Sequence, residues 1–383
     1  MVVQGNAGTA GLTMKFIFRA DASLQIGTGH VMRCLTLADA LDAKGAECQF
    51  ICRAHEGNLI DFIRSKGYVT HALPVAAESG DTANDQSPDS DLAHSAWLGA
   101  TQAEDANACA SILAAQHPDW LIVDHYALDI VWEEALAPYY HQLMVIDDLA
   151  DRKHVCDLLL DQTFGREAAD YLSLVPERCR LLCGSRYALL RSEFAALRSY
   201  SLQRRAKPVM RDLLVTLGGV DKDNATGQVL QALSTCSLPE NCRITVVMGA
   251  TAPWLDEVRN LAQQMPWSTR VLVGVSNMAQ LMADSDLAIG AAGATSWERC
   301  CLGLPTAMMV LADNQRHAAN LLEQASAVRM LYLNKDFSKD LARFIDDIYK
   351  SKYFFNQLRD NASAVTDGMG CGRAMSWLIL EKE

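Results

Sequence analysis

The segment that decides the fold reads Lys15-Phe-Ile-Phe-Arg19-Ala-Asp21-Ala-Ser-Leu-Gln-Ile-Gly27-Thr-Gly29-His30-Val-Met-Arg33-Cys-Leu-Thr-Leu-Ala-Asp-Ala-Leu-Asp-Ala-Lys44. It begins with an apolar run that predicts a short buried strand. Two glycines follow, and apolar residues then recur at helical spacing up to Gly45. The segment therefore predicts a strand, a glycine loop and a helix in succession. An α/β domain uses this arrangement to present polar groups at the carboxyl end of its sheet.

His30 is the candidate general base. It lies at the start of the predicted helix, where backbone N–H groups disfavour an imidazolium, and a neutral histidine at a sheet edge can accept a proton. Arg19, Asp21 and Arg33 are candidate contacts to a sugar or a phosphate. Two alternatives remain open: His30 only caps the helix, or the charged residues form ion pairs that rigidify the turn. A dinucleotide fingerprint fails because Met32 replaces its third glycine.

Length and composition limit the class of protein. The 383 residues suit two α/β domains, and half of them are apolar, as in ordinary globular proteins. The net charge of −12 argues against a nucleic-acid partner but leaves room for a small phosphate-bearing ligand. The twelve scattered cysteines indicate free thiols in a reducing compartment. No apolar run is long enough to span a membrane, so we expect a cytoplasmic protein without a membrane partner.

Apolar runs alternate with helical patterns along the chain, which predicts parallel sheets. We expect a disordered leader at 1–13, an N-terminal domain at 14–204 and a C-terminal domain at 205–383, with the basic segment 199–208 as linker and an acidic surface insertion at 78–92. Strands are expected at 15–19, 47–53, 69–73, 119–124, 143–146, 158–161, 180–183, 212–217, 244–248, 270–273, 286–289 and 306–310. The clusters Asp124-His125-Tyr126 and Asp147-Asp148 then reach the same sheet edge as His30.

The second half repeats the strand and glycine turn. Gly218 and Gly219 follow its first strand, and Gly293-Ala-Thr295-Ser296 opens a later helix. Backbone N–H groups and two hydroxyls there suit a diphosphate, and Glu298 could accept hydrogen bonds from a ribose. The alternative is a turn of small residues chosen for helix packing, with Glu298 favouring the helix dipole. A ligand between the two domains is the resulting expectation, while Trp297 is expected in the core.

Ten blocks of sequence together resemble the UDP-sugar hydrolases of pseudaminic acid biosynthesis (PseG type), in the order in which that family has them. The blocks are Arg19-Ala-Asp21, Ile26-Gly-Thr-Gly29-His30-Val-Met-Arg33-Cys, Trp97-Leu-Gly99, Val123-Asp-His-Tyr126, Ile146-Asp-Asp148, Tyr187-Ala-Leu-Leu-Arg191, Leu217-Gly-Gly-Val-Asp221, Gly293-Ala-Thr-Ser-Trp-Glu298, Asn314-Gln315 and Asp367-Gly-Met-Gly. More distantly, both halves resemble the GT-B glycosyltransferase that makes lipid II. The departures are the leader, the insertion at 78–92 and Met369, where the family often has lysine.

The resemblance implies two Rossmann-like domains that face a central cleft, the GT-B fold. It also implies hydrolysis of UDP-2,4-diacetamido-2,4,6-trideoxy-beta-L-altropyranose to UDP and free sugar, with inversion and without metal or cofactor, in a pathway that serves flagellin glycosylation. By position, His30 is similar to the family's base, and Tyr126 and Asn314 fall close to the sugar and the attacking water. Expected substrate contacts are Arg19, Asp21, Gly29, Arg33, Gly218, Gly219, Gly249, Val275, Asn277, Gly293, Thr295, Ser296, Glu298 and Gln315.

This chemistry needs few groups. UDP is a good leaving group once its phosphates are held, so a single base that activates water suffices. His125 and His317 are weaker candidates for that base. Two other functions remain open: a GT-B glycosyltransferase that uses the base on an acceptor hydroxyl, and a nucleotide-sugar binding protein without catalysis. We expect a monomer whose partner is the UDP-sugar itself.

Overall fold

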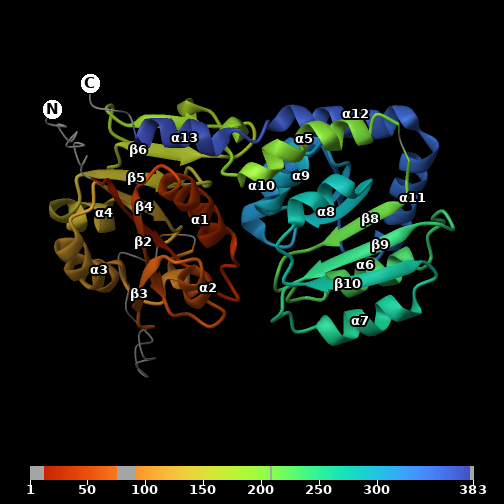
Figure 1. The fold of residues 1–383 in the computed structure, drawn as a ribbon, viewed down its shortest axis with the longest axis horizontal. Coiled ribbons are helices and arrows are strands. Elements are labelled where there is room, and N and C mark those ends of the chain that lie inside the picture. Colours follow the sequence, from red (N-terminus) through yellow and green to blue (C-terminus); the bar gives the residue numbers. More distant parts are fainter. Residues whose placement is uncertain (1–12, 76–91, 93, 208, 380–383) are drawn as a thin grey trace, which may run out of the picture.

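The computed structural model describes residues 13–75, 92, 94–207 and 209–379. These residues form two α/β domains that lie side by side (Figure 1), each built on one sheet in which all strand pairs are parallel. Two parallel-sheet α/β domains were predicted, and this is confirmed. The expected leader, except Thr13, and the expected insertion, except Leu92, lie outside the described residues.

The first sheet has, among the described residues, seven strands in the order β3-β2-β1-β4-β5-β6-β7. Their bounds are β1 (Lys15–Ala20), β2 (Glu47–Arg53), β3 (Val69–Leu73), β4 (Trp120–Asp124), β5 (Gln142–Ile146), β6 (Leu158–Asp161) and β7 (Arg180–Cys183). The strands are almost continuously apolar because helices cover both faces. One face packs on α1 (Gly29–Asp42), α2 (Ile60–Ser65) and α13 (Gly370–Leu378), and the other on α3 (Gln102–Gln116) and α4 (Ile130–Leu136).

The second sheet has six strands within the described part of the chain, in the order β10-β9-β8-β11-β12-β13. They are β8 (Asp212–Thr216), β9 (Arg243–Met248), β10 (Ser268–Val273), β11 (Leu287–Ala291), β12 (Thr306–Met309) and β13 (Arg329–Leu331). One face packs on α6 (Ala225–Leu233), α7 (Leu255–Gln264) and α11 (Phe337–Lys350). The other packs on α5 (Ser192–Arg204), α8 (Met278–Asp284), α9 (Thr295–Cys301) and α10 (Arg316–Gln324), and α12 (Lys352–Val365) contributes to both cores.

Short 3-10 helices complete the chain: η2 (Ser95–Leu98), η3 (Ala137–Tyr139), η4 (Ala168–Tyr171), η5 (Ser185–Tyr187) and η6 (Asp313–Gln315). All twelve expected strands are present, with differences at their ends, whereas the sequence pattern did not single out α4, α7 or β13. Trp297 is 6% exposed, which confirms its expected place in the core. The segment expected as a linker, 199–208, holds the end of α5, and α5 packs against α8 and α9.

Strand order reverses beside the first strand of each sheet. β1 lies between β2 and β4, and β8 lies between β9 and β11. In open parallel sheets, ligands bind outside the carboxyl ends of the strands at such a point. α1 follows β1 and α9 follows β11, so the topology places the starts of these two helices at the two expected ligand positions.

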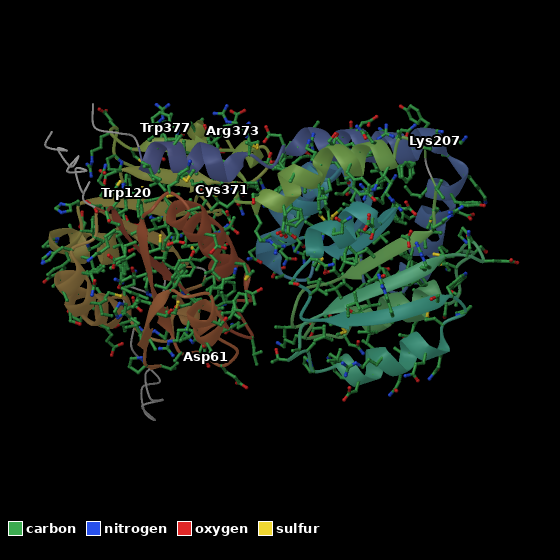
Figure 2. The ribbon with its side chains drawn as sticks, in the orientation of Figure 1. Asp61, Trp120, Lys207, Cys371, Arg373 and Trp377 are labelled. Atoms are coloured by element: carbon green, nitrogen blue, oxygen red, sulfur yellow. The ribbon has the colours of Figure 1, made fainter. Side chains whose placement is uncertain are left out.

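The chain passes between the domains at two adjoining segments, near η5 and just before α13. The Ser185 hydroxyl donates a hydrogen bond to the carbonyl of Val365 at 2.6 Å. Gly370 packs so closely on the backbone of Tyr187 and Ala188 that a Cβ would collide with it. As a result α13 packs on α1 of the first domain, where Figure 2 labels its Cys371.

We expect Gly370→Ala to lower the free energy of unfolding by about 1–3 kcal/mol, because the added methyl overpacks a backbone contact between the two crossing segments. Gly372 on the same helix is the matched control. A Cβ there meets no described atom within 4 Å, and alanine favours a helix over glycine by about 0.5–1 kcal/mol. Urea unfolding of both variants measures the difference, and equal stabilities would contradict the packing argument.

Candidate active site

His30 and Asp124 form the centre of the site in the first domain. His30 lies in the first turn of α1, and its Nδ1 is 2.5 Å from Oδ1 of Asp124, the last residue of β4. Arg33, one turn further along α1, holds the same carboxylate through Nε at 2.6 Å and Nη2 at 2.7 Å. The His30 ring is thus fixed against a side chain on the neighbouring strand, which goes beyond the role of a helix cap.

This contact decides which ring nitrogen of His30 is free. Burial acts to raise the pKa of Asp124, but the charge of Arg33 and the hydrogen bonds from Arg33 and His30 outweigh it and hold that pKa well below its usual range. Asp124 is therefore a carboxylate at neutral pH and can only accept a hydrogen bond, so Nδ1 of His30 carries the proton. In the neutral ring, Nε2 then keeps its lone pair, as a general base requires.

Tyr126 lies directly beside His30. The two rings meet edge to face, with centroids 4.6 Å apart and planes at 81°. The Tyr126 hydroxyl donates to Oδ2 of Asp148 at 2.9 Å, and Arg33 donates to the same oxygen at 2.6 Å. Burial and the nearby Asp148 raise the pKa of Tyr126 well above its usual value, so the side chain is a neutral phenol.

Arg19 and Asp21 have no exposed side-chain surface. Arg19 donates to Asp21 at 2.6 Å and makes two hydrogen bonds to the carboxylate of Asp105, at 3.1 and 2.7 Å. The structure therefore favours the alternative in which these residues rigidify the turn before α1. Arg33 is 6% exposed and forms ion pairs with Asp124 and Asp148, so carboxylates hold its guanidinium as well.

The two weaker base candidates lie elsewhere. His125 is 3% exposed, its Nδ1 accepts from the backbone N–H of Ala127 at 3.1 Å, and its Nε2 is 3.4 Å from Asp21. Burial lowers the pKa of His125, although Asp21 opposes the shift. His317 is exposed on α10. Of these three histidines, only His30 combines a ring held by a carboxylate with a nitrogen that has no hydrogen bond to another described residue, next to Tyr126.

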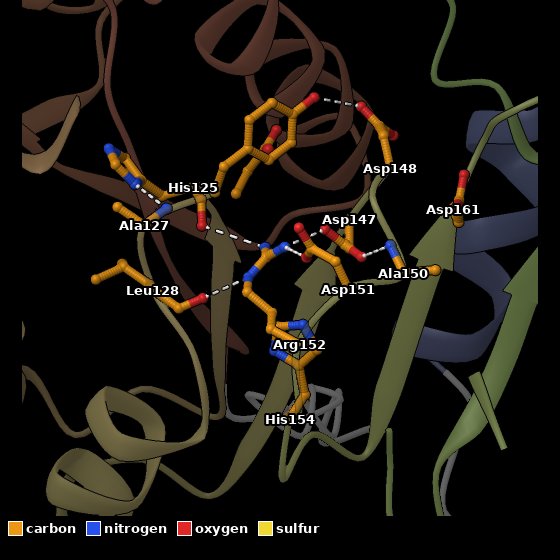
Figure 3. A network of polar contacts seen from close by, with 12 residues as sticks. His125, Ala127, Leu128, Asp147, Asp148, Ala150, Asp151, Arg152, His154 and Asp161 are labelled. Carbon is orange, nitrogen blue, oxygen red and sulfur yellow. Dashed lines mark hydrogen bonds and ion pairs between the residues drawn. The ribbon is translucent and has the colours of Figure 1, made fainter. Parts of the chain in front are cut away.

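The loops that follow β4 and β5 are held together by Arg152 (Figure 3). Its guanidinium lies 2.8 Å from Asp147 and 3.0 Å from Asp151, and it donates to the carbonyl of Leu128 at 2.9 Å. The other oxygen of Asp147 accepts from the backbone of Ala150 at 2.9 Å. This network fixes the sheet edge that carries Tyr126 and Asp148.

In the second domain, the loops at the carboxyl ends of β8, β9 and β10 carry five of the expected contacts. Gly218, at φ +97°, and Gly219 are exposed, and the N–H of Gly249 donates to the carbonyl of Gly219 at 2.9 Å. The first two loops therefore touch. Val275 is half-buried and Asn277 is exposed at the start of α8.

The start of α9 rests on a buried cation, Arg299, which is 1% exposed. It donates to the Thr295 hydroxyl at 2.9 Å, to the Ser296 hydroxyl at 3.3 Å and to the carbonyl of Ala291 at 2.6 Å. Its Nε has no hydrogen-bond partner among the described residues. Burial lowers the pKa of Arg299 to about 10, so the charge persists at neutral pH beneath the loop that begins with Gly293.

Glu298 is mostly buried, and burial raises its pKa to about 7, although Arg191 and Arg299 oppose the shift. Arg191 lies 3.9 Å away, on the segment that connects the domains. Gln315 accepts from the backbone of Leu311 at 3.0 Å through Oε1. Its neighbour Asn314 is half-buried in η6.

The first-domain and second-domain groups meet at Gly29. A Cβ on Gly29 would lie 3.9 Å from the Cβ of Ala294, so the residue before His30 adjoins the residue before Thr295. α1 and α10 lie on the facing sides of the two domains (Figure 1). The structure thus brings His30 to the start of α9. Among the described residues, no group of three or more His, Cys, Asp or Glu could hold a metal ion.

Sequence reasoning quoted Asp124 and Asp148 without giving them a role, and it did not name Arg299. Asp124 sits at the very end of a predicted strand next to Tyr126, and that position was the available signal. Arg299 gave no such signal because helical spacing alone does not show that its side chain turns back under the loop. No helix in the described part of the chain is both long and apolar enough to cross a membrane.

Two parallel-sheet domains with facing carboxyl-edge loops define the GT-B fold, and solved structures agree. MurG of Acinetobacter baumannii superposes with a TM-score of 0.67 at 13% identity, covering 96% of this chain and 99% of that one. UGT89C1 of Arabidopsis thaliana, solved with UDP-L-rhamnose, superposes with a TM-score of 0.64 at 13% identity, covering 97% of this chain and 99% of that one. At such identities the similarity shows the fold alone. The expected GT-B fold is confirmed.

The sequence comparisons are more specific. Residues 213–369 match the glycosyltransferase family 28 C-terminal domain. Over 309 residues the chain is 26% identical to the UDP-2,4-diacetamido-2,4,6-trideoxy-beta-L-altropyranose hydrolase of Campylobacter jejuni, covering 81% of this chain and 96% of that protein. The expected resemblance to this hydrolase is therefore confirmed, over most of both chains.

Proposed function

We propose that this protein hydrolyses UDP-2,4-diacetamido-2,4,6-trideoxy-beta-L-altropyranose to UDP and the free sugar, as a step of pseudaminic acid biosynthesis. The observation that carries the proposal is the His30–Asp124 pair, with Nε2 of His30 free, beside a loop that adjoins the start of α9 through Gly29 and Ala294. The similarity to the Campylobacter jejuni hydrolase supports the choice of substrate.

In the proposed binding mode, the second domain holds UDP. The exposed glycine loop at Gly218 and the start of α9 offer backbone N–H groups, and the charge of Arg299 beneath α9 favours the diphosphate. The carboxyl group of Glu298 is placed to meet the ribose. The sugar then faces the first domain, next to His30 and Tyr126.

In the proposed reaction, a water oxygen attacks the anomeric carbon while Nε2 of His30 takes a proton from that water. The bond between the anomeric carbon and the phosphate oxygen breaks, and UDP leaves with the electron pair. Asp124 stabilises the imidazolium that forms, as a carboxylate does in other aspartate–histidine pairs. Attack from the face opposite UDP inverts the anomeric configuration, and Tyr126 and Asn314 position the sugar and the water.

Incubation with the UDP-diacetamido sugar in ¹⁸O-labelled water, with EDTA and without an acceptor, tests the proposal. We expect stoichiometric UDP release, label in the sugar and not in UDP, and the inverted anomer as the first product seen by NMR. EDTA is expected to leave the rate unchanged, because the proposed steps use side chains alone. Label in UDP would instead indicate attack at phosphorus and would contradict the mechanism.

The match to the glycosyltransferase family 28 C-terminal domain favours one alternative, transfer of the sugar to an acceptor hydroxyl. Such an enzyme would use the same base and the same UDP-binding loops. It would release UDP slowly without acceptor and rapidly with one. The same incubation therefore separates the two functions.

A further inference from the structure

Three aromatic side chains form a continuous surface in the first domain, which we call the aromatic wall: His94, Trp97 and Tyr126. The rings of His94 and Trp97 have centroids 4.2 Å apart. Tyr126 lies 5.4 Å from the His94 ring and 5.8 Å from the Trp97 ring. The three planes are tilted by 32–38° to one another, closer to parallel than to perpendicular.

The aromatic wall begins at the proposed base and extends toward the surface. Tyr126 is 6% exposed and touches the edge of the His30 ring, whereas His94 and Trp97 are half-buried. The proposed hydrolysis uses neither His94 nor Trp97. Two partly exposed rings next to a base are therefore unexplained by the reaction itself.

The backbone that carries Trp97 is well supported. Trp97 lies in η2, its N–H donates to the carbonyl of His94 at 2.9 Å, and the next residue, Leu98, is 1% exposed in the core. Gly99 follows at φ +67°, where the ring of His55 leaves no room for a side chain. The Trp97 ring is thus presented from a fixed segment and not from a loose loop.

We propose that the aromatic wall binds the hexose of the substrate and selects nucleotide sugars that carry acetamido and deoxy groups. This inference rests on the proposed function. Aromatic faces pack well against C–H groups and methyl groups and poorly against hydroxyls, which need hydrogen-bond partners. Two acetamido methyls and a C6 methyl give a 2,4-diacetamido-2,4,6-trideoxy sugar more apolar surface than a glucose.

Trp97→Ala is the first test. We expect the KM for the UDP-diacetamido sugar to rise about tenfold, the loss of roughly one aromatic contact, while the Kd for UDP stays the same. Trp97→Phe keeps a ring and should recover most of the affinity. Trp377→Ala is the matched control, because Trp377 (labelled in Figure 2) is half-buried on α13 and packs on the core of one sheet face, whereas Leu98 of η2 belongs to the core of the other.

Direct binding separates this inference from the proposed function. In an inactive His30→Asn background, calorimetry gives the Kd for UDP and the Kd for the UDP-diacetamido sugar. The Kd for UDP divided by the Kd for the UDP-sugar reports how much the sugar contributes to binding. We expect Trp97→Ala and His94→Ala each to reduce that ratio severalfold, in proteins whose circular dichroism is unchanged. An unchanged ratio, or equal weakening of UDP itself, would overturn the role of the aromatic wall. Absence of UDP binding in the wild type would overturn the proposed function as well.

Discussion

Replacing His30 with asparagine is expected to lower kcat by about 10²–10⁴-fold, the usual contribution of a general base, while UDP binds with unchanged affinity. Asparagine can still hydrogen-bond to Asp124, so the ion pair between Asp124 and Arg33 should persist. The variant loses only the nitrogen that accepts the water proton. Steady-state kinetics with the UDP-diacetamido sugar and calorimetry with UDP measure the two effects.

His317→Asn is the matched control for this prediction. His317 is exposed on α10, and no hydrogen bond to another described residue holds its ring, so its replacement should leave kcat within about twofold, as surface substitutions usually do. If His30→Asn keeps more than about a tenth of the wild-type kcat, the base is another group. His125→Asn would then be the next variant to measure.

Replacing Asp124 with asparagine should reduce kcat by about 10²–10⁴-fold, although Asp124 touches no substrate in the proposed mechanism. The carboxylate accepts a hydrogen bond from Nδ1–H of His30 and so leaves Nε2 free. An amide can turn its NH₂ group toward Nδ1, and the ring then carries its proton on Nε2, where it cannot act as a base. The charge that stabilises the imidazolium is also lost.

Asp148→Asn separates this effect from the loss of an ion pair. Asp124 and Asp148 both bind Arg33, at 2.6 Å in each case, but only Asp124 contacts His30. Breaking a buried ion pair costs about 3–5 kcal/mol, and both variants should be destabilised. We expect the loss of kcat to be much larger for Asp124→Asn. Similar losses in two folded variants would mean that Asp124 acts only by holding Arg33.

Much of the fold could be predicted because its signals are local. Apolar runs followed by glycine and a helical pattern depend on the nearest residues, and they predicted β1, α1 and the parallel sheets correctly. The same local signals placed the cluster at Asp124 and the loop at Gly293 at strand ends. α4, α7 and β13 were not singled out. α4 and β13 are short, and such elements depend on packing more than on pattern.

The role of each charged residue could not be predicted in this way. Arg19 precedes the glycine loop and Arg33 follows it, and sequence left open whether they bind a ligand or carboxylates. Only the fold brings Asp105, 86 positions away, against Arg19, and Asp124, 91 positions away, against Arg33. Burial then favours the ion pairs, since a buried guanidinium needs a partner.

The sequence by itself determined that two α/β domains present glycine loops, a histidine and hydroxyl groups at the ends of their strands. The tertiary structure decided which of these groups act together: Asp124 with His30, Arg299 beneath Thr295, and Gly29 against Ala294. The physical reason is that hydrophobic periodicity reports the local burial of each segment. Hydrogen bonds between side chains depend instead on strand order and domain contact, which arise only when the whole chain packs.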